Sequence, residues 1–256
     1  WNGSGDIFVA WSWKGDGVAG GTLNEDGTID SQVNVNTAAG FSIIEFAGID
    51  DSTPTVGHGL TEAPEFVIAK NRDENGRWIV YATPLADGDN LWLNLTNAES
   101  ADTAYIQGQD NTSSVIQLNQ SSGNNNLGHS GDTIIMYAWH SVPGYSKMGT
   151  YEGNQNVDGT FVYTGFRPAF IIVKEQDNVS QWVLKDDKRS NSYNPQDERL
   201  APNLDNGPLG SGRDLDMVSN GFKFREDASD SSAMNDSATY VYIAFAASPF
   251  KYANAR

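Results

Sequence analysis

The heptapeptide Pro64-Glu-Phe-Val-Ile-Ala-Lys70 returns 104 positions later as Pro168-Ala-Phe-Ile-Ile-Val-Lys174. Both copies run from a proline through β-branched and aromatic residues to a lysine, a pattern typical of a buried strand. Matching segments follow at nearly the same spacing. Trp78-Ile-Val corresponds to Trp182-Val-Leu, and Met136-Tyr-Ala-Trp139 corresponds to Tyr242-Ile-Ala-Phe245. A spacing that holds over such a length indicates a duplicated unit.

The segments between these matches also have the pattern of strands and turns. Short apolar or alternating runs are separated by Gly, Asn, Asp and Ser, and no window has the 3.6-residue period of an amphipathic helix. Units of about 100 residues are the usual size of a β-sandwich. The sequence therefore predicts an all-β protein of two tandem antiparallel β-sandwich repeats, jelly-roll-like or lectin-like, at residues 41–145 and 146–256.

The first 40 residues form a separate region. Val9-Ala-Trp11 matches the closing segment Tyr137-Ala-Trp139, so a strand is expected over residues 7–13. Asp26-Gly27 predicts the turn of a hairpin between two short strands within Thr22-Leu-Asn-Glu-Asp-Gly-Thr-Ile29. We therefore interpret residues 1–40 as the end of a preceding module, followed by a hairpin or linker.

The charge balance and the missing cysteines exclude several classes of partner and site. The chain has 16 basic and 33 acidic residues, which gives a formal net charge of −17. Such a surface repels phosphate backbones and anionic lipid, so nucleic-acid binding is not expected. Membrane insertion is not expected either, because no apolar run approaches the ~18 residues that span a bilayer. The absence of cysteine excludes disulfides, thiol nucleophiles and cysteine-ligated metals.

No set of residues points to catalysis. His58, His129 and His140 lack metal-binding spacing, and the second copy has no histidine at the equivalent positions. The paired carboxylates lie in polar loops, whereas a glycosidase needs two facing acids, one of them partly buried. No GxSxG elbow occurs. We expect no catalytic residues and no enzyme activity; a polysaccharide hydrolase is the competing hypothesis.

Asn154-x-Asn156-x-Asp158-Gly159 has the spacing that opens a calcium-binding loop. Its side-chain oxygens stand at alternate positions, and its glycine suits the turn. The twelfth position, where such a loop needs a closing acidic ligand, is Gly165. Asn154, Asn156 and Asp158 are therefore either a weak Ca²⁺ site or a simple turn before a strand, and no other cofactor is expected.

The aromatic residues fall into two groups. Trp78 and Trp182 occupy matching positions, so both are expected to pack in the core of their repeat. Trp92, Tyr105 and Tyr193 are candidate binding residues, with exposed rings that could stack on sugars or on a neighbouring subunit. Ordinary packing at a sheet edge is the favoured interpretation of these three rings.

Two further features concern the rim of the sheets. Lys70 and Lys174 end equivalent strands, and their ammonium groups are expected to reach water while their stems cover apolar surface. The polar segment 185–212 has no counterpart of equal length in the first copy. This segment is the expected place for assembly or receptor contacts, because long loops in compact proteins are usually functional.

Four stretches carry a family likeness: Phe8-Val-Ala-Trp-Ser-Trp-Lys14, Gly159-Thr-Phe-Val-Tyr-Thr-Gly-Phe-Arg-Pro-Ala-Phe-Ile-Ile-Val-Lys174, Ser219-Asn-Gly-Phe-Lys223 and Ala244-Phe-Ala-Ala-Ser-Pro-Phe-Lys-Tyr-Ala-Asn-Ala-Arg256. Together they resemble a module that recurs at the C-terminus of large tail-associated, tail fibre-like structural proteins of tailed bacteriophages. The likeness covers nearly the whole chain from Phe8 to Arg256. Its Thr-Gly-Phe-Arg-Pro-Ala core and its Pro-Phe-Lys-Tyr ending are specific.

The resemblance implies a virion structural protein on the exterior of the particle, in a tail fibre or receptor-binding component that mediates host attachment. It brings no catalytic residue set. The expected partners are other virion proteins, further copies of the chain in a homo-oligomer, and a host surface polysaccharide or receptor. A capsid decoration or collar protein is the alternative within the particle. A carbohydrate-binding, lectin-like module is the alternative of another class.

Overall fold

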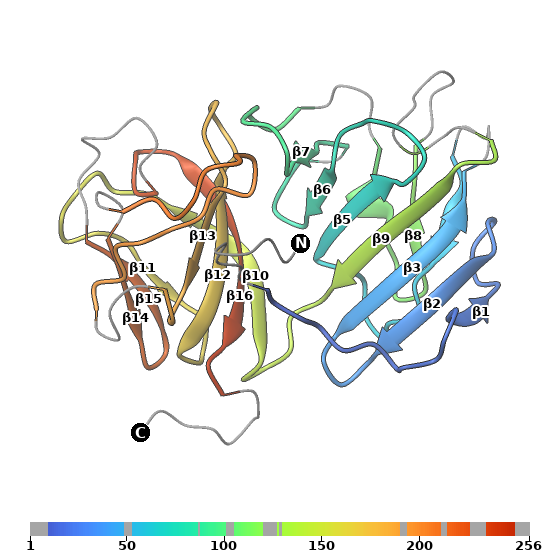
Figure 1. The fold of residues 1–256 in the computed structure, drawn as a ribbon, viewed down its shortest axis with the longest axis horizontal. Coiled ribbons are helices and arrows are strands. Elements are labelled where there is room, and N and C mark those ends of the chain that lie inside the picture. Colours follow the sequence, from blue (N-terminus) through green and yellow to red (C-terminus); the bar gives the residue numbers. More distant parts are fainter. Residues whose placement is uncertain are drawn as a thin grey trace, which may run out of the picture.

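The computed structural model describes residues 10–48, 53–86, 88–100, 105–119, 127, 130–189, 194–210, 214–225 and 234–248. Figure 1 shows antiparallel sheets in two groups, with the segment before β1 crossing the junction between them. Apart from the 3₁₀ turn at Gly108–Asp110, the ordered elements in the described part are all strands, so the prediction of an all-β protein is confirmed. No helix among these residues has the length and apolar character needed to cross a membrane.

The strands divide between the two halves of the chain. The first half contains β1 (Thr22–Asn24), β2 (Ser31–Asn36), β3 (Phe41–Ala47), β4 (Thr55–Gly57), β5 (Phe66–Asn71), β6 (Ile79–Ala82), β7 (Leu91–Trp92), β8 (Val115–Gln117) and β9 (Thr133–Trp139). The second half contains β10 (Ser146–Glu152), β11 (Phe161–Tyr163), β12 (Pro168–Glu175), β13 (Val183–Asp186), β14 (Leu215–Val218), β15 (Gly221–Phe224) and β16 (Thr239–Ala246).

The two halves share one strand order. The first large sheet runs β1-β2-β3-β9-β5-β6-β7, and the second runs β10-β16-β12-β13, so that β3-β9-β5-β6 corresponds to the whole second sheet. The small pair β4-β8 likewise corresponds to β11-β15. The register agrees as well. Trp139 of β9 lies opposite Phe66 of β5, and at the equivalent place Phe245 of β16 lies opposite Phe170 of β12.

Each half has an apolar core between its large and small sheets, because alternate side chains of a strand point to the same face. The first core includes Ile44, Val67, Ile79 and Met136 from the large sheet, and Val56, Ile116 and Leu118 from the small sheet and the residues beside it. The second core includes Ile171, Val173, Tyr240 and Tyr242 on one side, and Val162, Met217, Phe222 and Phe224 on the other. Burying a side chain of this size contributes ~1.5–3 kcal/mol.

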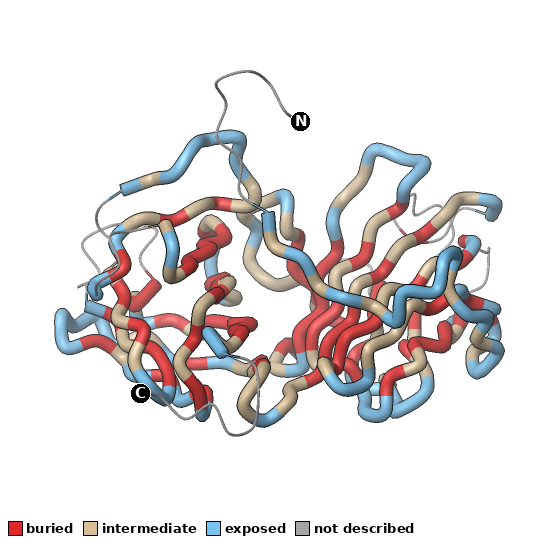
Figure 2. The backbone as a smooth tube through the Cα atoms, turned by 60° about the horizontal axis from the view of Figure 1, so that its bottom comes forward, coloured by how far each residue is buried: buried red, intermediate tan, exposed pale blue. Residues whose placement is uncertain are grey.

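A third apolar cluster joins the halves through the outer faces of the two large sheets. Phe66 and Trp139 of the first half belong to it, as do Phe170 and Phe245 of the second. The ring of Trp13 lies among them, with its centroid 5.6 Å from that of Phe170 and 6.0 Å from that of Trp139. Figure 2 shows the buried backbone of the two halves meeting at this junction.

The predicted strand over residues 7–13 is wrong for the part that the structure describes, because residues 10–13 form no strand. Residues 7–9 lie outside the described part. Trp11 and Trp13 instead place their rings between the halves, where Trp11 meets Phe170 edge to face at 5.1 Å. The likeness to a closing strand therefore reflects aromatic residues that pack, and not a strand that pairs.

The N-terminal hairpin is longer than predicted. Strand β1 pairs with β2 so that Thr22 lies opposite Val33, and residues 25–30 connect the two strands. Ile29, expected in the second strand, makes a single parallel bridge with Val56 of β4. Ile29 and Val33 are both buried in the first core. Their burial fixes the register, because a shift by one residue would turn Val33 to the opposite face.

Candidate binding site

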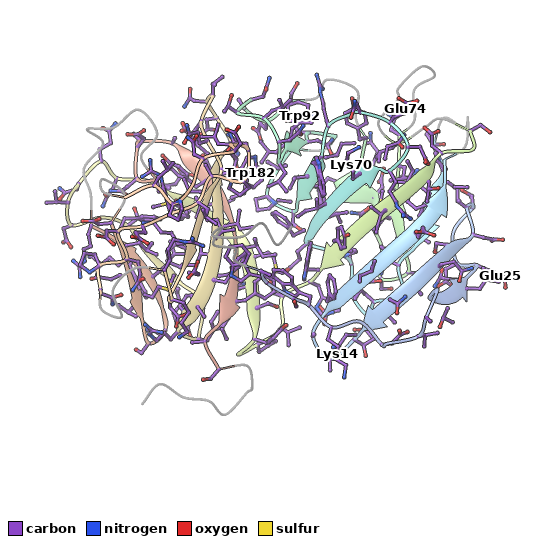
Figure 3. All side chains as sticks on the ribbon, in the orientation of Figure 1. Lys14, Glu25, Lys70, Glu74, Trp92 and Trp182 are labelled. Atoms are coloured by element: carbon purple, nitrogen blue, oxygen red, sulfur yellow. The ribbon has the colours of Figure 1, made fainter. Side chains whose placement is uncertain are left out.

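An open depression of about 830 Å³ lies on the outer face of the first large sheet, and we call it the Trp78 pocket. It is lined by Lys70, Asn71, Arg72, Asp73, Glu74, Asn75, Trp78, Ile135 and Tyr137. These residues come from the end of β5, the turn between β5 and β6, and β9. Figure 3 shows Lys70 and Glu74 in the first half, near the end of β5, whereas Trp92 and Trp182 lie at the junction of the halves.

The turn that forms the rim of the pocket is held by Asn71. The side-chain oxygen of Asn71 accepts the backbone N–H groups of Asp73 and Glu74 at 2.9 and 3.2 Å. Its amide nitrogen donates to the carboxylate of Asp132 at 2.7 Å. An asparagine that satisfies backbone groups in this way favours a tight turn over a continued strand. Strand β5 therefore ends at Asn71, and the polar residues after it stand at the rim.

The lysine that ends this strand also holds the turn. The Lys70 ammonium donates to the carbonyl oxygens of Asn71 and, at 2.7 Å, of Glu74. Lys174 in the second half binds the carbonyls of Glu175 and, at 3.4 Å, of Asn178.

The two lysines differ in their exposure. Lys174 is completely buried, and this burial lowers the pKa of its ammonium to about 8. The expectation that both ammonium groups reach water is therefore wrong for Lys174. Lys70 makes the equivalent hydrogen bonds and is only half-buried, so the turn carbonyls alone do not account for the burial of Lys174.

The charged groups at the rim are largely engaged with one another. Arg72 pairs with Glu45 at 2.6 Å, and both side chains are about half exposed. Asp73 accepts the backbone N–H of Thr133 at 2.6 Å. An exposed ion pair of this kind contributes less than ~1 kcal/mol. The rim is thus a neutralised polar border, not a source of strong charge.

The floor and wall of the pocket are apolar and aromatic. Trp78 is 37% exposed, and its backbone N–H is held by the side-chain oxygen of Asn94 at 2.9 Å. Ile135 and Tyr137 of β9 are half-buried beneath it. An aromatic wall over an apolar floor, bordered by amides and charges, suits a ligand with an apolar face and hydrogen-bonding groups. Both a loop of another polypeptide and a sugar ring have this character.

The expectation that both matching tryptophans lie in a core is wrong for Trp78. Trp182 is 1% exposed, whereas Trp78 is 37% exposed. The indole N–H of Trp182 donates to the backbone carbonyl of Trp92, in the other half, at 2.8 Å. The difference therefore comes from the contact between the halves, which covers Trp182 and leaves Trp78 open.

For Trp92 and Tyr105 the structure shows packed rings, so the alternative of exposed binding rings is wrong for these two residues. Trp92 is 2% exposed, and the guanidinium of Arg77 lies over its ring at 4.6 Å. Tyr105 is 3% exposed and belongs to the first core. Trp182 of the second half and Arg77 of the first half cover the surroundings of Trp92. Tyr193 lies outside the described residues.

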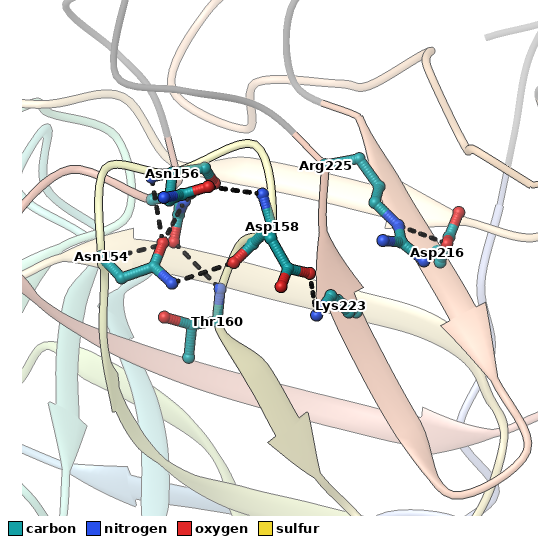
Figure 4. A network of polar contacts seen from close by, with 8 residues as sticks. Asn154, Asn156, Asp158, Thr160, Asp216, Lys223 and Arg225 are labelled. Atoms are coloured by element: carbon teal, nitrogen blue, oxygen red, sulfur yellow. Dashed lines mark hydrogen bonds and ion pairs between the residues drawn. The ribbon is translucent and has the colours of Figure 1, made fainter.

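The loop at Asn154, Asn156 and Asp158 is a hydrogen-bonded turn (Figure 4). The side-chain oxygen of Asn154 accepts the N–H of Asn156 at 3.1 Å, and that of Asn156 accepts the N–H of Asp158 at 2.9 Å. Asn235 donates a further bond to Asn154 at 2.9 Å. The Asp158 carboxylate pairs with Lys223 at 2.6 Å, which lowers the pKa of Asp158. Calcium binding by this loop stays a prediction.

His58 has a structural place that a threonine takes in the second half. Its Nδ1 accepts the backbone N–H of Leu60 at 3.0 Å, and its Nε2 lies 3.2 Å from the carbonyl of Thr112. Thr164 holds the N–H of Phe166 in the same way at 3.4 Å. Burial lowers the pKa of His58, so the neutral ring is favoured. His140 lies beside the Ser141 carbonyl, and His129 is outside the described residues.

The long segment 185–212 has a counterpart in the first half over part of its length. Leu200-Ala-Pro-Asn-Leu-Asp-Asn206 folds like Leu91-Trp-Leu-Asn-Leu-Thr-Asn97. In both stretches the fifth residue donates its N–H to the carbonyl of the second, at 2.9 and 3.1 Å. The asparagine at the fourth position accepts the backbone N–H of Trp182 in one and of Trp78 in the other, at 3.1 and 2.9 Å.

The sequence held one signal for the Trp78 pocket that its interpretation missed. The turn before Trp78 reads Arg72-Asp-Glu-Asn-Gly-Arg77, whereas the turn before Trp182 reads Gln176-Asp-Asn-Val-Ser-Gln181. The first turn has four charged residues, whereas the second has only Asp177. Charged residues at a turn indicate contact with water, so the difference between the copies pointed to different exposure.

Comparisons with known proteins place the chain by its sequence. No curated protein and no solved structure matches it. A family model described as a domain of unknown function, DUF7483, matches residues 1–249. Because the match spans nearly the whole chain, the protein belongs to the DUF7483 family.

Proposed function

We propose that the protein is a non-enzymatic structural component of a tailed-phage particle, exposed on the outside and acting in host attachment as part of a tail fibre or receptor-binding assembly. Its body would be two tandem antiparallel β-sandwich repeats at residues 41–145 and 146–256. The likeness to tail-associated modules motivates the proposal. Its expected neighbours are other virion proteins, further copies of the chain and a host surface polysaccharide or receptor.

The observation that carries the proposal is the repeated strand order, with a separate core in each half and an apolar cluster between them. Two similar bodies joined by an apolar cluster would act as one unit rather than as a hinged pair around a cleft. Such a unit suits a load-bearing or adhesive part, in which many weak contacts act together. The open pocket on one half supplies a place for contact.

The particle itself provides the test. Antibodies raised against the purified chain are applied to particles assembled from the genome that encodes it, and electron microscopy locates the label. Label on the tail supports the proposal, and label on the shell favours a capsid decoration or collar protein. Absence of the chain from purified particles, measured by mass spectrometry, overturns a virion role. Release of sugar from host capsule or lipopolysaccharide by the purified chain overturns the non-enzymatic part.

A glycan-binding role is the second candidate, and the exposed indole of Trp78 beside Tyr137 favours it. Aromatic side chains commonly present an apolar face with a polar edge, which matches a sugar ring. A glycan array probed with the purified chain and with Trp78→Ala tests this role. Phe161→Ala is the matched control, because Phe161 is a 45% exposed ring outside the pocket. Binding that survives Trp78→Ala excludes the pocket.

A further inference from the structure

We propose that the Trp78 pocket binds residues 201–208 of a second copy of this chain, so that copies join head to tail. The inference rests on the homo-oligomer included in the proposed function and names the surfaces that form it. The argument comes from the duplication: the same site in the second half is already occupied, and its occupant is the first-half equivalent of residues 201–208.

The equivalent site in the second half is covered by residues 92–99. The Trp182 indole donates to the Trp92 carbonyl at 2.8 Å. The backbone N–H of Ser180 donates to the carbonyl of Thr96 at 2.8 Å, and the N–H of Glu99 donates to the carbonyl of Gln176 at 2.7 Å. These bonds join the loop of one half to the turn of the other.

Burial follows this contact closely. Val241 and Ile243 on β16 are 1% and 3% exposed, whereas their counterparts Ile135 and Tyr137 are only half-buried. At the rim, Lys174 and Trp182 are likewise buried, whereas Lys70 and Trp78 are partly exposed. The outer face of the second large sheet is therefore covered. The equivalent face of the first large sheet is open, although it has a lysine and a tryptophan at the matching positions.

The matching loop of the second half is exposed. Residues 205–208 are exposed, and Leu204 is 37% exposed. The loop has the backbone turn of residues 91–97, and the bridge between Arg199 and Leu209 repeats the one between Asn90 and Ser100. The chain thus presents both a free site and a loop with the shape that fills such a site.

The chemistry of the loop fits the pocket. Two of the three bonds described above end on backbone carbonyls of the covering loop, those of Trp92 and Thr96. In the loop of the second half, Ala201 and Asp205 have the equivalent carbonyls. The third bond needs an N–H, and the counterpart of Glu99 is Pro208, which has none. We therefore expect the contact between copies to be weaker than the contact between halves.

The charges at the rim of the open site are already balanced. The open turn has Arg72, Asp73, Glu74 and Arg77, of which Arg72 pairs with Glu45 and Arg77 lies over the Trp92 ring. Asp205 of the loop therefore meets a rim without net charge. Because the net charge of −17 makes copies repel, salt near 0.15 M is needed to screen the rest of the surface.

Site and loop lie in different halves, so the contact is heterologous. Such a contact produces a ring if the rotation between copies closes and an open chain if it does not. It also predicts a specific behaviour for variants. A copy with a defective site keeps a working loop, and a copy with a defective loop keeps a working site.

The test measures the mass of the assembly by light scattering and by sedimentation over a range of concentrations. Trp78→Ala removes the wall of the site, and Asp205→Arg replaces a short side chain at a contact residue of the loop with a long, charged one. Wild type is expected to exceed 27.8 kDa increasingly with concentration, and each variant to stay at that mass. An equimolar mixture of the two variants should form dimers of twice that mass and nothing larger.

Two controls separate a specific effect from a general one. Phe161→Ala removes an exposed ring outside the pocket. Glu25→Arg makes the same change of charge as Asp205→Arg at an exposed position directly after β1. Both should assemble like wild type, and circular dichroism should show native strand content for every variant.

Several outcomes would overturn the proposal. They are a wild-type chain that stays at 27.8 kDa at every concentration, variants that still assemble, or a mixture that stays monomeric. A monomeric wild type whose glycan binding is lost in Trp78→Ala would assign the pocket to sugar instead. None of these results affects the location of the chain in the particle, which labelling measures separately.

Discussion

Two residues of the same type at matching positions have different environments in this protein. Trp182→Ala should lower the free energy of unfolding by about 3–5 kcal/mol, because it empties a buried site and leaves the Trp92 carbonyl without its indole donor. Trp78→Ala should lower it by about 1 kcal/mol or less, since much of that ring is already in water. Urea unfolding followed by circular dichroism measures both. Equal losses would contradict the environments described.

His58 gives the protein a dependence on pH that can be predicted in sign. Burial lowers the pKa of His58 below its ordinary value of 6.5, and this effect outweighs the opposing hydrogen bond to Thr112 and the charge of Asp26. Between the folded pKa and 6.5 the unfolded chain binds more protons than the folded one. The contribution of His58 is therefore complete above pH 6.5 and is lost as the pH falls toward its folded pKa.

The measurement is the free energy of unfolding at several pH values between 8 and about 5, where one proton accounts for a slope of at most ~1.4 kcal/mol per pH unit. His58→Thr is the informative variant, because Thr164 already holds the equivalent turn in the second half. It should keep the turn and flatten the slope. A slope unchanged by His58→Thr would assign the pH dependence to other groups.

Among the elements, the loop that follows β7 and its counterpart at residues 200–206, after β13, test whether the duplication extends to the turns. Asn94 and Asn203 accept the backbone N–H groups of Trp78 and Trp182 at 2.9 and 3.1 Å. Asn94→Ala and Asn203→Ala should each cost about 1 kcal/mol, because each leaves a backbone donor without its acceptor. Thermal unfolding with matched buffers compares the two. A cost confined to one variant would mean that the turns are alike in shape but not in energy.

The sequence predicted the strands well, because each depends on a local pattern of apolar residues. Matching strings such as those ending in Lys70 and Lys174 do form equivalent strands with equivalent register. The hairpin near Asp26 was predicted too short, since its register depends on burying Ile29 against Val56, a residue far along the chain. Local pattern thus predicts which segments pair but not every partner.

The candidate site could not be predicted from the same patterns, because exposure is decided by contacts between elements. The string around Trp78 and the string around Trp182 are alike, and only the position of residues 92–99 makes one open and the other closed. The same contact explains why Trp92 is buried despite its place at the end of a short strand. The charged turn before Trp78 was the remaining signal, and it becomes informative only when the copies are compared.

At the scale of the whole molecule, the described residues form three apolar clusters, one in each half and one between them. The junction is incompletely filled, because an apolar cavity of about 230 Å³ remains beside Trp11, Trp13 and Leu93. Each half could keep its own core if the junction failed. The coupling of the halves therefore depends strongly on the aromatic residues of the N-terminal segment.

This coupling gives a prediction for thermal unfolding. Wild type should unfold in one calorimetric transition, with calorimetric and van't Hoff enthalpies nearly equal, because the junction links the two cores. Trp11→Ala combined with Trp13→Ala removes the edge-to-face contacts with Phe170, whose centroids lie at 5.1 and 5.6 Å. The loss of about 2–4 kcal/mol should separate the transition into two, with an enthalpy ratio above one. Leu23→Ala, at a 53% exposed position, should leave a single transition. Two transitions already present in wild type would mean that the halves are joined by their linker alone.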